Sequence, residues 1–189
     1  RPSGGFAGTE FRQTVVGDAG STGELNVGDG VGIANSASVE TNDDLYIGRA
    51  GGSGLMRVRS DGRVELRTSS NAAEVFVGQS SSGTVLQTGG TVTSDNTVRI
   101  GSEAGGIGRY TISAGLFSTA TGGTGTFTVG RNGGNGILRV EGTGQFVHGA
   151  ELYLGDVSNA ATSGRLEIIG STASVQIGQL ENATGGAAG

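Results

Sequence analysis

A four-residue motif recurs along the whole chain: two apolar residues on either side of a variable residue, followed by glycine. Its glycines are Gly17, Gly48, Gly78, Gly101, Gly130, Gly155 and Gly178. They are separated by 31, 30, 23, 29, 25 and 23 residues, which is an imperfect repeat of about 27. A period in this range indicates stacked repeat units, because one short unit cannot bury an apolar face alone.

The stretch 126–149 shows one unit in full. Alternating apolar residues at Phe127 and Val129 lead to a Gly/Asn turn, a second alternating run at Ile137–Val140 and a third at Gln145–Val147. Alternation with a period of two, bounded by glycine, is typical of β-strands. We therefore predict an all-β fold, a single-stranded parallel β-solenoid of about six to seven coils. Each coil has three short strands, and there is essentially no α-helix.

The second and third strands of each coil can be aligned in the same way. The second strand follows a glycine, and we expect Val27, Val58, Ile112 and Val140 to stack in one inward column. One copy, Gly83–Gln87, is out of phase by a residue, so a bulge or a shortened turn is expected there. Third strands should centre on Val39, Val64, Val92, Phe117, Phe146 and Val175. The copy ending at Gly178 fits either a first or a third strand.

Composition excludes several classes of protein. The 40 glycines lack a Gly-X-Y period and there is one proline, which excludes collagen, while 34% apolar residues in alternation argue against disorder. All 12 basic residues are arginine, and 17 acidic residues give a net charge of −5, without the basic cluster expected for nucleic-acid binding. No apolar run is long enough to span a membrane, and there is no cysteine. The start at Arg1, the low charge and the Gly/Ser/Thr content predict a processed or excised chain in an extracellular setting.

The repeats resemble the passenger-associated strand repeats of secreted bacterial β-helix proteins. The unit that carries the resemblance contains Leu45–Gly48, Gly54–Val58 and Gly62–Val64, with glycine corners between short strands. The likeness extends from Val15 to about Gly178. It implies a solenoid in a surface or fibre protein, a group that includes spacers, adhesins and fibre bodies.

Residues for metal binding or catalysis are sparse. The pattern Gly-Gly-x-Gly-x-Φ-x-Φ resembles the calcium-binding nonapeptide repeat, but apolar Met56, Tyr110, Phe127 and Leu138 stand where that repeat has aspartate. Two interpretations are considered for Asp18, Asp29 and Asp43/Asp44: an isolated ion site, and aspartates that lie in turns and are solvated by water. The second is preferred. His148, the only histidine, is expected to point outward. The carboxylate pairs Glu151/Asp156 and Asp61/Glu65 are weighed against isolated surface acids. We expect no enzyme, no cofactor and no metal.

Two surface patterns suggest binding. Thr-x-Thr occurs at 91–93, 119–121 and 126–128, but these fall in different parts of the coil, so a flat ice-binding face is not expected. The middle positions of first strands hold Tyr46, Phe76, Arg99, Thr128 and Tyr153, an expected outward column. Two interpretations stay open for it: a contact for carbohydrate or a neighbouring protein, and an incidental exposed column. The sequon at Asn182 is a candidate glycan site.

The two ends lead to the functional prediction. The chain reads as a single domain, with a head at 1–13, coils at 14–178 and a tail at 179–189. Neither end contains a polar cap, which isolated solenoids require. We therefore predict a structural subunit of an extracellular filament that stacks head to tail on itself. The joint would contain Phe6, Phe11, Val15, Ile177 and Leu180. The alternatives are a segment of a larger surface adhesin, or a β-helix that binds or cleaves polysaccharide.

Overall fold

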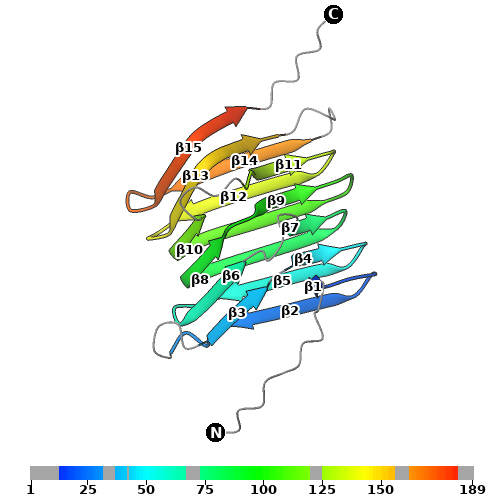
Figure 1. The fold of residues 1–189 in the computed structure, drawn as a ribbon, viewed down its shortest axis with the longest axis horizontal. Helices are drawn as coiled ribbons and strands as arrows, with labels where there is room; N and C mark the ends of the chain where they lie inside the picture. Colours follow the sequence, from blue (N-terminus) through cyan, green and yellow to red (C-terminus); the bar gives the residue numbers. More distant parts are fainter. Residues whose placement is uncertain are drawn as a thin grey trace, which may run out of the picture.

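The chain folds into a stack of parallel β-strands. In the computed structural model, residues 13–31, 37–41, 43–66, 73–119, 125–155 and 162–182 are described. They form fifteen strands and no helix, and every strand pair is parallel. The strands follow the sequence from β1 at the lower end of Figure 1 to β15 at the upper end. This arrangement confirms the predicted all-β parallel solenoid.

Three ladders run along the stack, each containing one strand or half-strand from every coil. The first ladder consists of β1 (Gln13–Val16), β4 (Asp44–Arg49), β7 (Glu74–Gln79), β9 (Thr97–Ser102), β11 (Phe127–Arg131) and the second halves of β13 (Gln145–Leu154) and β15 (Ser174–Asn182). The second consists of β2 (Thr22–Val27), β5 (Ser53–Val58), the first halves of β8 (Ser82–Ser94) and β10 (Ile107–Thr119), β12 (Asn135–Glu141) and β14 (Ser163–Ile169). The third consists of β3 (Ala37–Thr41), β6 (Gly62–Leu66) and the remaining halves of β8, β10, β13 and β15.

The number of coils follows from these ladders. Among the described residues, the second and third ladders have six strands each and the first has seven. Five steps separate the six strands of the second ladder, so the stack makes about five turns between β2 and β14. Val175 pairs with Phe146, so the motif that ends at Gly178 belongs to the third ladder.

Glycine is required at the corner between the first and second ladders. Gly48 ends the apolar part of β4 with a φ of 80°, a left-handed conformation that side chains disfavour. Gly54, near the start of β5, packs so tightly that an added Cβ would lie 2.1 Å from the carbonyl oxygen of Val16. The same two glycine positions recur in register along the ladders, which explains the spacing of the sequence motif.

Apolar side chains form continuous inward columns. In the second ladder, Val27 is followed by Val58, Gln87, Ile112, Val140 and Ile168. In the third ladder, Val39 is followed by Val64, Val92, Phe117, Phe146 and Val175. Both predicted columns are therefore confirmed, and their interior members are almost completely buried.

The prediction of an out-of-phase strand at Gly83 was wrong. Gly83 aligns with Gly54 and Gly108, so Val85 and Gln87 take the two inward positions. The sequence appeared shifted only because a glutamine stands where the other interior coils have Val or Ile. Irregular pairing occurs one step later, between Ile112 and Leu116, where β8 and β10 pass through a corner without ending.

Candidate functional site

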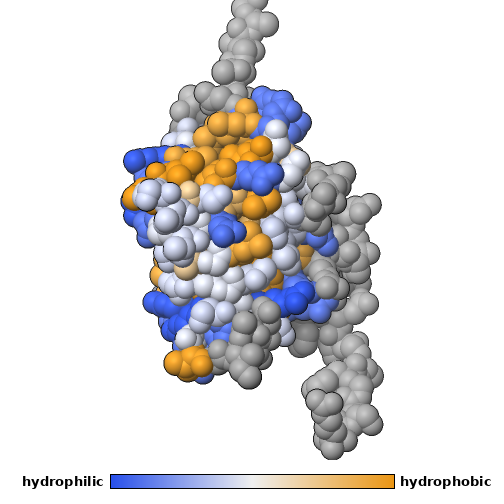
Figure 2. All heavy atoms as spheres, turned by 90° about the vertical axis from the view of Figure 1, so that its left-hand side faces the viewer, coloured by the Kyte–Doolittle hydropathy of each residue, from blue (hydrophilic) through white to orange (hydrophobic). Residues whose placement is uncertain are grey.

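The C-terminal end of the stack presents an open apolar edge. Ile168, Ile169 and Leu180 are 54%, 43% and 57% exposed. Among the described residues, β14 pairs only with β12, and β15 pairs only with β13, so each has one edge without a partner strand. Hydrophobic atoms also gather toward the upper end of the face in Figure 2, the end at which β13 to β15 lie in Figure 1. We call the outer edges of β14 and β15 the C-terminal edge.

The exposure of this edge arises from its position in the stack. Ile168 shares its column with Val140, and Leu180 shares its column with Leu152. Val140 and Leu152 are completely buried because another coil covers them. A further coil on the C-terminal edge would remove Ile168 and Leu180 from water in the same way, and full burial of such a side chain contributes about 1.5–3 kcal/mol.

The predicted joint residues fall at opposite ends of the stack. Ile177 and Leu180 lie together in β15 on the C-terminal edge, where Ile177 is half-buried and follows His148 in register. Val15 lies in β1 at the other end, half-buried and on the outer column of the first ladder. Phe6 and Phe11 lie outside the described residues. Ile168 and Ile169 were not among the predicted joint residues. The signal that could have found them is the absence of a further Gly-x-Φ-x-Φ run in residues 170–189, which would have supplied a covering strand.

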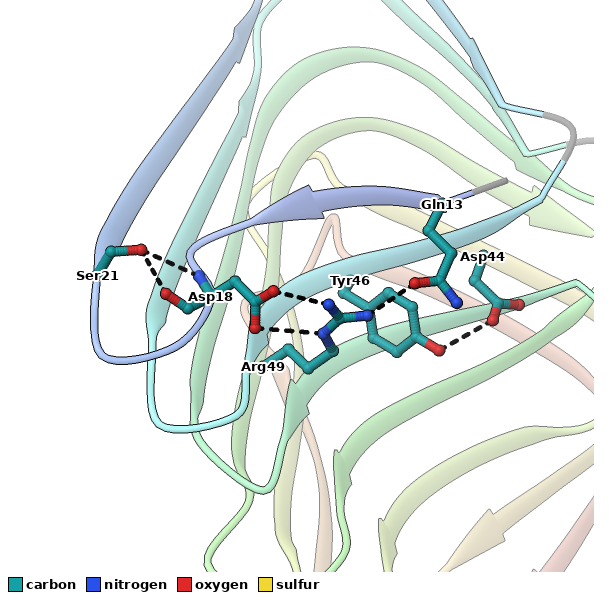
Figure 3. Close-up of polar contacts among 6 residues, drawn as sticks. All are labelled: Gln13, Asp18, Ser21, Asp44, Tyr46 and Arg49. Carbon is teal, nitrogen blue, oxygen red and sulfur yellow. Dashed lines mark hydrogen bonds and ion pairs between the residues drawn. The ribbon is translucent and has the colours of Figure 1, made fainter. Parts of the chain in front are cut away.

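On the outer side of the first ladder, aromatic rings, hydrogen bonds and ion pairs form a network (Figure 3). Tyr46 stacks on Phe76 with ring centroids 4.8 Å apart, and the guanidinium of Arg49 lies 4.7 Å from the centroid of Tyr46. Arg49 also pairs with Asp18 at 2.7 Å and donates to Oε1 of Gln13 at 2.8 Å. These contacts join the first coil to the second.

This network corrects the predicted binding column at three of its five residues, whereas the other two, Arg99 and Tyr153, are half-buried. Tyr46, Phe76 and Thr128 do share an outer column, but they are only 7%, 5% and 6% exposed. The two rings cover one another and are overlaid by Arg49 and Arg99. They therefore do not form an exposed aromatic surface for carbohydrate or a neighbouring protein.

The pKa values in this network follow from its contacts. Hydrogen bonds from Arg49 lower the pKa of Asp18 and raise that of Arg49. Burial, together with the hydrogen bond from the Tyr46 hydroxyl to Asp44, raises the pKa of Tyr46 to about 12. Asp18 and Asp44 are therefore held by protein donors, and Oδ1 of Asp44 also accepts the Glu74 amide at 2.8 Å.

His148 lies inside the core, so the prediction of an outward histidine was wrong. It is 1% exposed and packs against Phe127 and Phe146. Nε2 lies 2.9 Å from the Glu151 carbonyl oxygen, and Nδ1 lies 3.1 Å from the Thr119 hydroxyl. A carbonyl only accepts, so Nε2 carries the proton and Nδ1 accepts from Thr119. The alternation after inward Phe146 was the signal that could have found it.

The positions compared with the calcium repeat are part of the core. Met56, Tyr110, Phe127 and Leu138 are all buried in the hydrophobic cluster. Within the described ranges, no three His, Cys, Asp or Glu side chains lie close enough together to hold a metal ion. In the part of the chain that is described, the arrangement therefore supports packing and offers no assembled cation site.

The carboxylate pairs are not arranged around an open cleft. Asp61 is 2% exposed and accepts the backbone amides of Asp29 and Gly30 at 3.1 and 2.8 Å. Glu65 is buried and forms an ion pair with Arg63. Glu151 accepts the Tyr153 hydroxyl, and its predicted partner Asp156 lies outside the described residues.

Two further predictions have limited structural context. Asn182 ends β15 at the C-terminal edge, and the rest of its sequon lies outside the described residues. Thr91–Thr93 lies in the third ladder and Thr128 in the first, so these threonines do not share a face.

Comparison of the chain with family models, with curated proteins and with solved structures gives no match. Over the described residues, no helix is long and apolar enough to cross a membrane.

Proposed function

We propose that this chain is a structural, non-enzymatic subunit that stacks head to tail into an extracellular filament. The observation that carries the proposal is the C-terminal edge, where columns that are buried inside the stack end in exposed Ile168 and Leu180. The partner that best fits this edge is the first coil of a second copy. That coil repeats the same three-ladder cross-section, beginning with β1, β2 and β3.

The joint has the properties of strand addition. The outer edges of β14 and β15 would supply main-chain hydrogen bonds, and the strands added there would cover the apolar columns. The two surfaces differ, so the contact is heterologous, and it generates an open filament when it does not close into a ring. No covalent bond is needed for such a joint to persist.

The two ends do not meet as flat surfaces. Among the described residues, the first ladder is one strand longer than the other two. A second copy whose β1 pairs with β15 would therefore leave room for one strand in the second ladder and one in the third. In this proposal the head and tail segments, including Phe6 and Phe11, fill these two strand positions in the joint.

The extracellular setting rests on the composition of the chain and on the resemblance of its repeats. There is no cysteine or lysine among its 189 residues, and 40 are glycine. The passenger-type repeats that it resembles belong to secreted bacterial proteins, some of which form fibres.

The test compares the purified chain with variants of its C-terminal edge. Sedimentation velocity and negative-stain electron microscopy should detect filaments whose length rises with protein concentration. Leu180→Glu and Ile168→Glu should each leave predominantly monomers, because a charged side chain would be buried in the joint. Ile107→Glu is the matched control, since Ile107 is 47% exposed on a second-ladder strand inside the stack and should not affect assembly.

Circular dichroism spectra and thermal melts of all three variants establish whether each remains folded. A wild-type chain that stays monomeric at every concentration would contradict the filament proposal. It would favour the adhesin alternative, in which flanking sequence covers the edge.

A further inference from the structure

The outer side of the second ladder carries a group of arginines on three adjacent strands. Arg109 on β10 and Arg165 on β14 lie in one column, with Ile137 of β12 between them. Arg139 of β12 lies in the neighbouring column, between Thr111 and Glu167. Together these six side chains line a shallow hollow of about 290 Å³. We call it the arginine hollow.

The carboxylates in this region neutralise only part of the positive charge. Glu167 accepts from Arg139 at 2.6 Å and from Arg165 at 2.9 Å, and Glu141 lies 3.7 Å from Arg139. Arg109 is exposed and forms no ion pair within the described part of the chain. Three guanidinium groups therefore share two carboxylates, in a protein whose net charge is −5.

A second hollow continues along the same outer side. It has a volume of about 540 Å³ and extends over β2, β5 and β8. Its side chains are the hydroxyls Thr22, Ser53, Ser82 and Thr84, the aliphatic Leu55 and Leu86, and the acid Glu24. Both hollows lie on the outer columns of one ladder, so a linear ligand along the stack would contact hydroxyl and aliphatic groups first and arginines next.

We propose that the outer side of the second ladder binds an acidic polysaccharide that lies along the stack. Arginine recognises carboxylate and sulfate groups with two parallel hydrogen bonds, and Arg109 presents an exposed guanidinium for this contact. The serine and threonine hydroxyls match the hydroxyls of a sugar chain, and the leucines match the C–H faces of its rings. The surface is open and shallow, which suits an extended polymer better than an enclosed small molecule.

Nucleic acid fits this surface less well. Single-stranded nucleic acids are bound through aromatic side chains that stack on bases, and neither hollow is lined by an aromatic residue.

Calorimetric titration with a polyuronate tests the proposal. The wild-type chain should bind, and Arg109→Gln should weaken binding roughly tenfold, the change expected for one lost charge-assisted hydrogen bond. Arg63→Gln is the matched control, because Arg63 is exposed in β6 of the third ladder, pairs with Glu65 and lines neither hollow. It should bind like the wild type, and affinity should fall as salt rises.

Three further ligands distinguish the source of binding: a neutral glucan, poly-glutamate and a single-stranded oligonucleotide. Weak or absent binding of all three supports an acidic sugar chain. Any one of four results would overturn the proposal. These are equal binding of the glucan, tighter binding of poly-glutamate or of the oligonucleotide, no binding of the polyuronate, and an unchanged affinity in Arg109→Gln. Repeating the titration with the Leu180→Glu variant separates binding from assembly, since Leu180 is not part of either hollow.

Discussion

Gln87 and His148 are large polar side chains at inward positions of the solenoid, and each is matched by specific partners. Gln87 is completely buried, with its Nε2 donating to the Leu116 carbonyl and its Oε1 accepting the Tyr110 hydroxyl, both at 2.9 Å. His148 is held between the Thr119 hydroxyl and the Glu151 carbonyl. A buried polar group without such partners would cost about 1–3 kcal/mol. The core therefore accepts polarity only where neighbouring groups satisfy it.

His148 should make stability depend on pH. Burial lowers its pKa below the ordinary value of 6.5. Below pH 6.5 the unfolded chain binds a proton that the folded chain does not, so the free energy of unfolding should fall as pH decreases from 6.5 toward the lowered folded pKa. Above pH 6.5 this contribution is fully present. The slope should approach about 1.4 kcal/mol per pH unit.

Urea unfolding of the wild type and of His148→Gln between pH 7.5 and 5.5 measures this effect. The variant should lose less stability than the wild type over that range, because glutamine does not titrate. Identical pH dependence in the two proteins would show that His148 does not titrate differently in the folded and unfolded states.

Gly54 should tolerate no side chain. A Cβ there would lie 2.1 Å from the Val16 carbonyl oxygen and 2.3 Å from the Gly48 amide nitrogen, both of which are backbone atoms. We expect Gly54→Ala to destabilise the fold by at least about 3 kcal/mol, since backbone of two coils would have to separate. Gly149 is the control, because a Cβ there meets nothing within 4 Å. In denaturant unfolding, the free energy of unfolding of Gly149→Ala should stay within about 0.5 kcal/mol of the wild-type value. A similar loss of stability in both variants would contradict this explanation of the corner.

At the scale of the strand, stability depends on columns that continue from coil to coil. Val140 lies between Ile112 and Ile168 in its column, whereas Val147 lies on the outer side of the third ladder and is only half-buried. Val140→Ala should reduce the free energy of unfolding by about 2 kcal/mol, and Val140→Asp should prevent folding of the stack. Val147→Ala should cost less than about 1 kcal/mol. Chemical denaturation checks the order, and equal losses for the two alanine variants would argue against an inward column at Val140.

Much of the strand pattern could be predicted from the sequence because its causes are local. Period-two alternation determines which residues face inward, and the glycine pairs mark a corner that has no room for side chains. Val39, Val64 and Val92 could therefore be assigned to one column despite unequal loop lengths.

The remaining features depend on contacts between coils. Gln87 is acceptable inside because Tyr110 of the next coil donates to it, and no pattern within its own strand reveals that partner. Burial of Tyr46 likewise requires Phe76 from the following coil and Arg49 beside it. The exposed Ile168 is an inward residue by pattern, and its position at an open edge becomes evident only when the coils are placed.

At the scale of the whole molecule, the two ends of the stack differ. The first ladder extends one strand further than the others at the C-terminal end, and acidic residues are concentrated in the first two coils. A body with open strand edges and unlike ends suits polar, end-to-end growth. It also leaves the outer side of the second ladder available along the length of a filament.

The orientation of the strands within the assembled filament tests the central proposal most directly. Head-to-tail stacking predicts that aligned filaments diffract X-rays with a reflection at about 4.8 Å on the meridian, because the spacing between coils is then parallel to the filament axis. Lateral association of solenoids would place that spacing on the equator. A strong meridional reflection is the result that we expect, and filaments with an equatorial reflection would contradict end-to-end stacking.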